Sequence, residues 1–120
     1  YVTGRGTEEH GTILPAISPF QKERSCISKV LLAGTNVICT QAAEAKSREL
    51  IELTGVPLPL KFYPQGRDST MSYLDVLDKI KMPGCAIVAV PDHLHYEVTS
   101  ACLEKGLHTL MVKPLTTTAV

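Results

Sequence analysis

The sequence predicts an open parallel α/β sheet with helices on both of its faces. Short apolar runs alternate along the 120-residue chain with runs that are rich in helix formers. The run at residues 86–90 is apolar at every position, as expected for a strand that is covered on both faces. Parallel strands joined by helices cross over with one hand, so the carboxyl ends of the strands share one edge of the sheet.

The composition indicates a soluble, cytoplasmic domain with one core. Hydrophobic residues make up 44% of the chain, and 12 basic side chains balance 12 acidic ones, which excludes a basic nucleic-acid surface. No apolar run approaches the roughly 20 residues that span a bilayer, and no signal peptide opens the chain, so we expect no membrane partner. The four cysteines lack the C-x-x-C spacing of a zinc or redox site, and we expect buried, reduced thiols.

The first half of the chain predicts a strand, a helix and a second strand. Residues 29–33 and 37–40 are both apolar and β-branched, and either is a candidate for the earlier strand. Residues 41–53 are rich in helix formers, and Gly55 follows them as a stop signal. Residues 58–63 then form a short extended segment hemmed by prolines.

The second half repeats this alternation. A turn at residues 66–68 leads into a helix, for which Asp68, Ser69 and Thr70 are candidate N-caps. The apolar stripe of this helix ends before Met82. The remaining expected elements are the strand over residues 86–90, a helix over 93–105 that Asp92 caps, and a strand over 108–112.

The residues beyond the strand ends are the candidate site, because open parallel sheets bind ligands past the carboxyl ends of their strands. If residues 1–3 end a first strand, these candidates are Gly4, Arg5 and Gly6, then Asn36 or Thr40, residues 64–67, Pro91, Asp92, His93 and His95, and finally Lys113 and Pro114. The turn at Gly4, Arg5 and Gly6 is either a phosphate-binding loop at a helix N-terminus or a plain turn.

Three interpretations are open for His93 and His95. An H-x-H pair binds a metal when it lies on an extended strand, but on a helix the two side chains are about 200° apart around the axis. Since a helix is expected after Asp92, we expect no metal site. The histidines are then exposed or capping residues, or the segment contacts a bound cofactor.

Lys113 is a single basic residue directly after an apolar run, and Pro114 follows it. It is either a charge that emerges from the sheet into solvent, or a proton donor or acceptor that orients a substrate oxygen.

Residues 85–118 closely resemble the dinucleotide-binding domain of the glucose-fructose oxidoreductase and inositol dehydrogenase family (Gfo/Idh/MocA). The family's T-P-N-x-x-H, A-G-K-H and E-K-P motifs read here V-P-D-H-L-H, K-G-L-H and V-K-P. Upstream, Gly4, Arg5 and Gly6 with His10 are similar to the family's R-G-x-x-H. The resemblance implies a Rossmann-type sheet in which residues 1–3 end the first, central strand.

The resemblance further implies an NAD(P)-dependent oxidoreductase that passes a hydride between the nicotinamide and a sugar, cyclitol or other polyol. Lys113 matches the lysine of the E-K-P motif, near nicotinamide ribose and substrate, and is the expected catalytic residue. The turn from Pro91 to His95, with Lys113 and Pro114, would line the nicotinamide side. Gly4, Arg5 and Gly6 would bind the pyrophosphate.

The chain departs from the family pattern in ways that affect cofactor and activity. Val112 replaces the glutamate of E-K-P, and the acidic residue that usually follows the second strand is missing, with Asn36 or Thr40 in its place. Either NAD or NADP is therefore an expected cofactor. The family's C-terminal substrate domain, through which its members associate as homo-oligomers, is not within these residues, so we expect a domain cut at both ends. A catalytically silent nucleotide-binding or sensing module is the alternative.

Overall fold

The computed structural model describes residues 10–113 and residue 115. The chain divides into two compact units, Tyr1–Ser72 and Tyr73–Val120, and each is described by itself. The strand expected at residues 1–3, the Gly4, Arg5 and Gly6 turn, and Pro114 lie outside the described residues.

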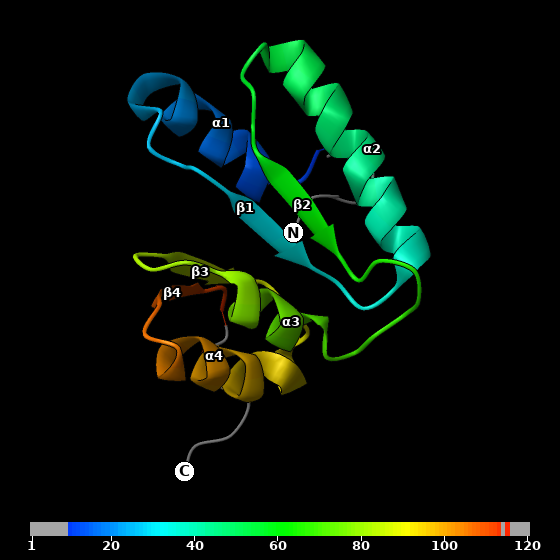
Figure 1. The fold of residues 1–120 in the computed structure, drawn as a ribbon, viewed down its shortest axis with the longest axis vertical. Helices are drawn as coiled ribbons and strands as arrows, with labels where there is room; N and C mark the ends of the chain where they lie inside the picture. The colour runs from blue at the N-terminus through cyan, green and yellow to red at the C-terminus, as the bar shows by residue number, and fades with distance from the viewer. Residues whose placement is uncertain (1–9, 114, 116–120) are drawn as a thin grey trace. The chain divides into compact units, whose positions relative to one another are not determined.

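The first unit pairs two parallel strands and packs two helices beside them (Figure 1). Its elements are α1 (Ile13–Arg24), β1 (Val30–Ala33), α2 (Val37–Thr54) and β2 (Leu60–Tyr63). β1 and β2 run parallel, with Val30 opposite Leu60 and Ala33 opposite Tyr63. The expected strands at 29–33 and 58–63 are therefore confirmed.

Helix α1 was not predicted from the sequence. It contains two prolines, which usually interrupt helices. Pro15 lies in the first turn, where backbone N–H groups have no partner within the helix, and Pro19 removes a single hydrogen bond inside the helix. Leu14 of α1 packs with Leu50 and Phe62 in the buried core of the unit, so this tertiary packing stabilises the helix.

Residues 37–40 are not a strand but the first turn of α2. The backbone of Asn36 is extended and its side chain accepts a hydrogen bond from the Cys39 N–H, so Asn36 is the N-cap of the helix. This cap outweighs the β-branched residues that follow it. At the other end, Gly55 has a φ of 66° and closes the helix, which confirms it as the stop.

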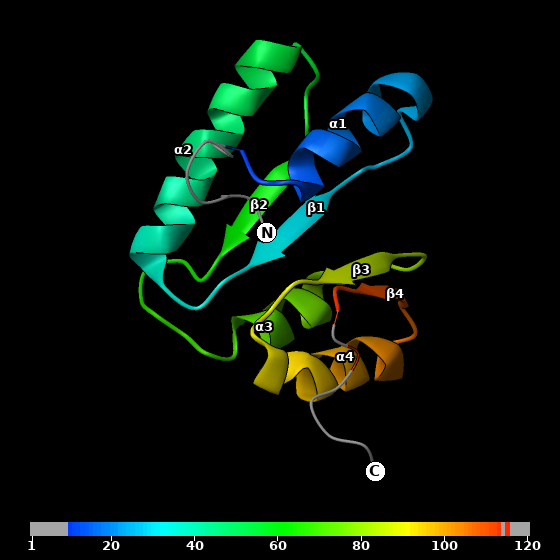
Figure 2. The same ribbon diagram turned by 180° about the vertical axis from the view of Figure 1, so that it is seen from behind.

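The second unit also pairs two parallel strands, with two helices beside them (Figure 2). Its elements are α3 (Ser72–Lys79, whose first residue belongs to the first unit), β3 (Cys85–Val88), the short 3-10 helix η1 (Asp92–Leu94), α4 (His95–Glu104) and β4 (His108–Met111). β3 and β4 run parallel, with Cys85 opposite His108 and Val88 opposite Met111. Among the described helices, none combines the length and apolarity needed to cross a membrane.

The second unit by itself covers only one face of the apolar strand. Val88 is buried and packs with Leu77 of α3 and Val98 of α4. Ile87 and Leu110, which face each other across β3 and β4 on the other side, are 40% and 64% exposed. Both helices that the unit provides cover the same face, so this strand pair has one open side.

The described strands form two separate parallel pairs rather than one continuous sheet. In each pair the two strands are consecutive in the sequence, and a helix connects them, as the alternation predicts.

Three of the four cysteines are exposed, contrary to the expectation of buried thiols. Only Cys102 is buried, whereas Cys26, Cys39 and Cys85 are exposed and all four are free. Cys39 lies on the solvent side of α2 rather than in a strand, and Cys85 lies on the open side of β3. Burial raises the pKa of the Cys102 thiol.

Candidate functional site

The segments that follow β3 and β4 lie side by side, because these strands are neighbours. The Val112 N–H donates to the Val88 carbonyl oxygen at 3.0 Å, which carries the parallel ladder one residue past the end of β4. Lys113 follows directly and is exposed. On the neighbouring strand, the chain continues from Val88 to Pro91 and Asp92, which are also exposed. The register of the pair thus places Lys113 next to the segment that leads into η1.

His95, which is buried within the second unit, contacts the chain just before Pro91. Its side chain is 1% exposed, and its Nε2 lies 2.9 Å from the Val90 carbonyl oxygen, to which it donates when the ring proton is on that nitrogen. We expected His95 to contact a cofactor directly. The structure shows the ring enclosed by protein and holding the chain just before Pro91, and a contact of His95 with a cofactor stays a prediction.

The two histidines of the H-x-H sequence lie in different environments. His93 is exposed in η1, whereas His95 is buried at the start of α4. Across residues 10–113 and 115, no group of three or more His, Cys, Asp or Glu side chains is close enough to hold a metal ion.

A second cluster of polar groups lies beyond the carboxyl end of β1, at the start of α2. Asn36, whose Oδ1 accepts from the Cys39 N–H at 3.0 Å, donates through Nδ2 to Asp68 Oδ2 at 3.2 Å. The Val37 N–H donates to the other oxygen of the same carboxylate, Asp68 Oδ1, at 2.8 Å. Asp68 therefore does not cap the helix that follows it, as its position in the sequence suggested, but lies at the N-terminus of α2.

The loop that carries Asp68 is held against the end of β1 on its other side. The Ser69 N–H donates to the Thr35 carbonyl oxygen at 2.9 Å. The hydroxyl of Ser72, which is 2% exposed, donates to the Gly34 carbonyl oxygen. These contacts fix the position of the Asp68 carboxylate. Sequence reasoning missed it because no local spacing connects residues more than thirty positions apart.

Thr40, the alternative to Asn36 at this strand end, lies one turn inside α2. Its side chain is 9% exposed, and its hydroxyl donates to the Asn36 carbonyl oxygen at 2.8 Å. Asn36 thus lies closer to the end of β1 than Thr40, whose hydroxyl is occupied within the helix, and a cofactor contact of either residue stays a prediction.

Each unit has polar groups at a carboxyl strand end that suit part of a dinucleotide. A carboxylate and an amide beyond β1 are the acceptor and donor that ribose hydroxyls need. The exposed Lys113 ammonium beyond β4 offers up to three donors for a substrate or ribose oxygen. Each group lies at a carboxyl strand end, where open α/β sheets bind their ligands.

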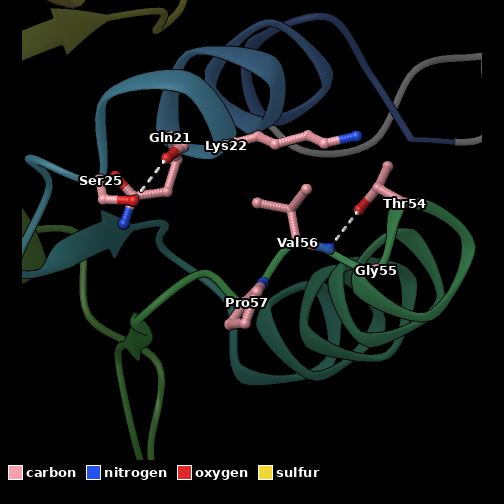
Figure 3. A pocket seen from close by; sticks show the side chains of 7 residues that line it. All are labelled: Gln21, Lys22, Ser25, Thr54, Gly55, Val56 and Pro57. Carbon is pink, nitrogen blue, oxygen red and sulfur yellow. Dashed lines mark hydrogen bonds between the residues drawn. The ribbon is translucent and has the colours of Figure 1, made fainter.

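A hollow of about 420 Å³ lies at the opposite ends of β1 and β2, between the end of α1 and the segment after α2 (Figure 3). Several of its polar groups already form hydrogen bonds within the protein. The Gln21 side chain both donates to and accepts from the backbone of Ile27 at 3.0 Å, and the Val56 N–H donates to the Thr54 hydroxyl. The carboxyl ends of the strands remain the candidate site.

The chain is similar to known proteins. The Gfo/Idh/MocA model, described as an oxidoreductase family with an NAD-binding Rossmann fold, matches residues 39–120. A scyllo-inositol 2-dehydrogenase (NADP(+)), IolW of Bacillus subtilis (strain 168), is 30% identical over 115 residues, which are 95% of this chain and 24% of that protein's length. No solved structure matches the chain. The parallel strand pairs with their connecting helices and the match over more than half of the chain show that it belongs to the Gfo/Idh/MocA family of oxidoreductases with an NAD-binding Rossmann fold.

Proposed function

We propose that this chain supplies the nucleotide-binding part of an NAD(P)-dependent dehydrogenase that acts on a cyclitol, sugar or related polyol. The family supports the cofactor class, and the name of the relative, an inositol dehydrogenase, supports the substrate class. Since the chain covers 24% of that relative, we further propose that a substrate-binding and oligomerising domain lies outside these residues. The two units described here would serve the cofactor.

The observation that carries the proposal is the pair of exposed segments beyond β3 and β4. Pro91 and Asp92 follow one strand, and Lys113 follows its parallel neighbour. This edge is where a nicotinamide and its substrate meet a Rossmann-type sheet. When bound, the nicotinamide supplies or accepts the hydride.

Lys113 would hold the substrate oxygen at this edge. Its Nζ is a compact cation on a flexible stem, so it donates hydrogen bonds to a hydroxyl or carbonyl oxygen and stabilises negative charge that develops there. Proton transfer between Nζ and that oxygen would accompany oxidation or reduction of the carbon that bears it. Pro91 and Asp92 would border the same space, and His95 would position them through the Val90 carbonyl.

The test is turnover in the full-length protein with a panel of polyols, followed by the absorbance of the reduced cofactor. Lys113→Met should lower kcat by roughly 10²–10⁴-fold, the range for loss of a positioned proton-transfer group. Lys81→Met is the matched control, because Lys81 is also exposed but precedes β3 at the amino end of the strand. We expect the control to retain turnover.

Unchanged turnover in Lys113→Met would contradict the catalytic role of this lysine. Nucleotide binding without turnover of any polyol would instead support the alternative, a silent nucleotide-binding or sensing module.

A further inference from the structure

The Asp68 carboxylate at the start of α2 is the strongest feature that the proposed function leaves unused. We propose that Asp68 makes this chain select NAD over NADP, by accepting a hydrogen bond from the adenosine ribose and repelling a 2′-phosphate. This inference rests on the proposed function, since it assumes that the chain binds a dinucleotide.

The Asp68 carboxylate lies where Rossmann-type domains bind the adenosine ribose. In Rossmann-type domains an acidic residue after the second strand binds the ribose hydroxyl of NAD, whereas an arginine accommodates the phosphate of NADP. With the strand expected at residues 1–3 counted as the first, β1 is the second. The residues that follow β1, Gly34 to Val37, include no acid. Asp68 brings a carboxylate to the same strand end from the loop after β2.

The first turn of α2 has two of its backbone N–H groups already hydrogen-bonded to side chains. Free N–H groups in the first turn of a helix attract phosphate. In α2 the Val37 N–H is taken by Asp68 at 2.8 Å, and the Cys39 N–H is taken by Asn36 at 3.0 Å. The site that would attract a phosphate thus has two of its donors occupied, and it already holds a negative charge.

The Asp68 carboxylate can accept further hydrogen bonds. Two carboxylate oxygens offer about four acceptor positions, and the protein uses one on each oxygen. Asp68 is exposed, so the other positions are open to a ribose hydroxyl. A hydroxyl donates to such an oxygen, whereas a phosphate at the same place brings two anions together.

The neighbouring Arg67 would favour NADP rather than NAD. It is exposed, and a guanidinium pairs well with phosphate. We expect Asp68 to determine the preference, because hydrogen bonds with Val37 and Asn36 fix its carboxylate and the contact of Ser69 with Thr35 fixes its loop. The exposed Arg67 side chain would first have to be ordered, which costs conformational entropy.

The test measures the affinities of NADH and NADPH from the fluorescence of the bound nucleotide. Wild type should bind NADH at least about tenfold more tightly than NADPH, the ratio expected for one unfavourable charge pair at a surface. Asp68→Asn keeps an oxygen for the Val37 N–H and removes the charge, and Asp68→Ser removes the charge with a smaller side chain. Both should reduce the NADH preference by about tenfold, mainly through tighter NADPH binding.

The matched control is Asp78→Asn, which makes the same change at an exposed position on α3 and should leave the ratio unchanged. A second measurement needs no variant and covers the case in which the Asp68 variants do not fold. Added salt should narrow the gap between the two nucleotides in wild type, because the repulsion is screened.

Equal or tighter binding of NADPH by wild type would overturn the inference and leave the proposed function intact. The same holds for an unchanged ratio in folded Asp68 variants. If wild type binds neither nucleotide, the proposed function falls, and the inference falls with it.

Discussion

Replacing His95 by phenylalanine tests how the turn after β3 is held in place. Phenylalanine keeps an aromatic ring at a site that is 1% exposed, but it removes the nitrogen that lies 2.9 Å from the Val90 carbonyl oxygen. Loss of this partly buried hydrogen bond should lower the free energy of unfolding by about 1 kcal/mol. His95→Ala also leaves a cavity where the ring was, and should cost about 3 kcal/mol in total.

Urea unfolding followed by far-UV circular dichroism measures both variants, since the chain has no tryptophan to report unfolding. The affinity for NADH, measured on the same samples, should fall in both variants because Pro91 and Asp92 lose their anchor. His108→Phe is the matched control, as His108 is exposed at the start of β4. If His95→Phe unfolds and binds NADH like wild type, the hydrogen bond to Val90 does not position this turn.

Two further predictions concern α2. Asn36→Ala removes the acceptor of the Cys39 N–H and should cost about 1 kcal/mol of stability towards urea, whereas unchanged stability would refute the cap. Lys46, through a hydrogen bond at 3.3 Å and its charge, lowers the pKa of the Glu49 carboxyl, so Lys46→Met should raise this pKa in a carboxyl-carbon NMR titration. Since the folded pKa is lowered, the stabilisation is present above the pKa of unfolded Glu49 and is lost as the pH falls through the folded pKa. Wild type and Lys46→Met should therefore converge in stability at acidic pH, and an unshifted Glu49 pKa would contradict the pairing.

The sequence predicted most elements because their signals are local. The apolar runs that became β1 and β3 and the glycine that ends α2 act within a few residues of their own positions. Residues 37–40 were ambiguous for the same reason, since their β-branched side chains favour a strand while the preceding Asn36 favours a helix start. The hydrogen bond from Val37 to Asp68 adds a tertiary contribution to the helix that no local pattern contains.

The sequence indicated which candidate residues follow strands, but not what surrounds them. The strand-end rule found Asn36, Pro91 and Lys113, all of which follow strands in the structure. It could not find Asp68, because a loop contact brings that residue to β1 from beyond β2. Nor could it show that His95 is buried, since burial depends on how α4 packs on its strand pair.

We propose that a nicotinamide nucleotide binds at the carboxyl ends of the strands. Titration of the isotope-labelled chain with NADH, followed by backbone amide NMR shifts, tests it most directly. We predict that the largest shifts occur at residues 34–37, at Asp92 and His93, and at Lys113. Shifts centred instead on residues 21–25 and 54–56, around the hollow at the amino ends of β1 and β2, or no shifts at all, would contradict the account.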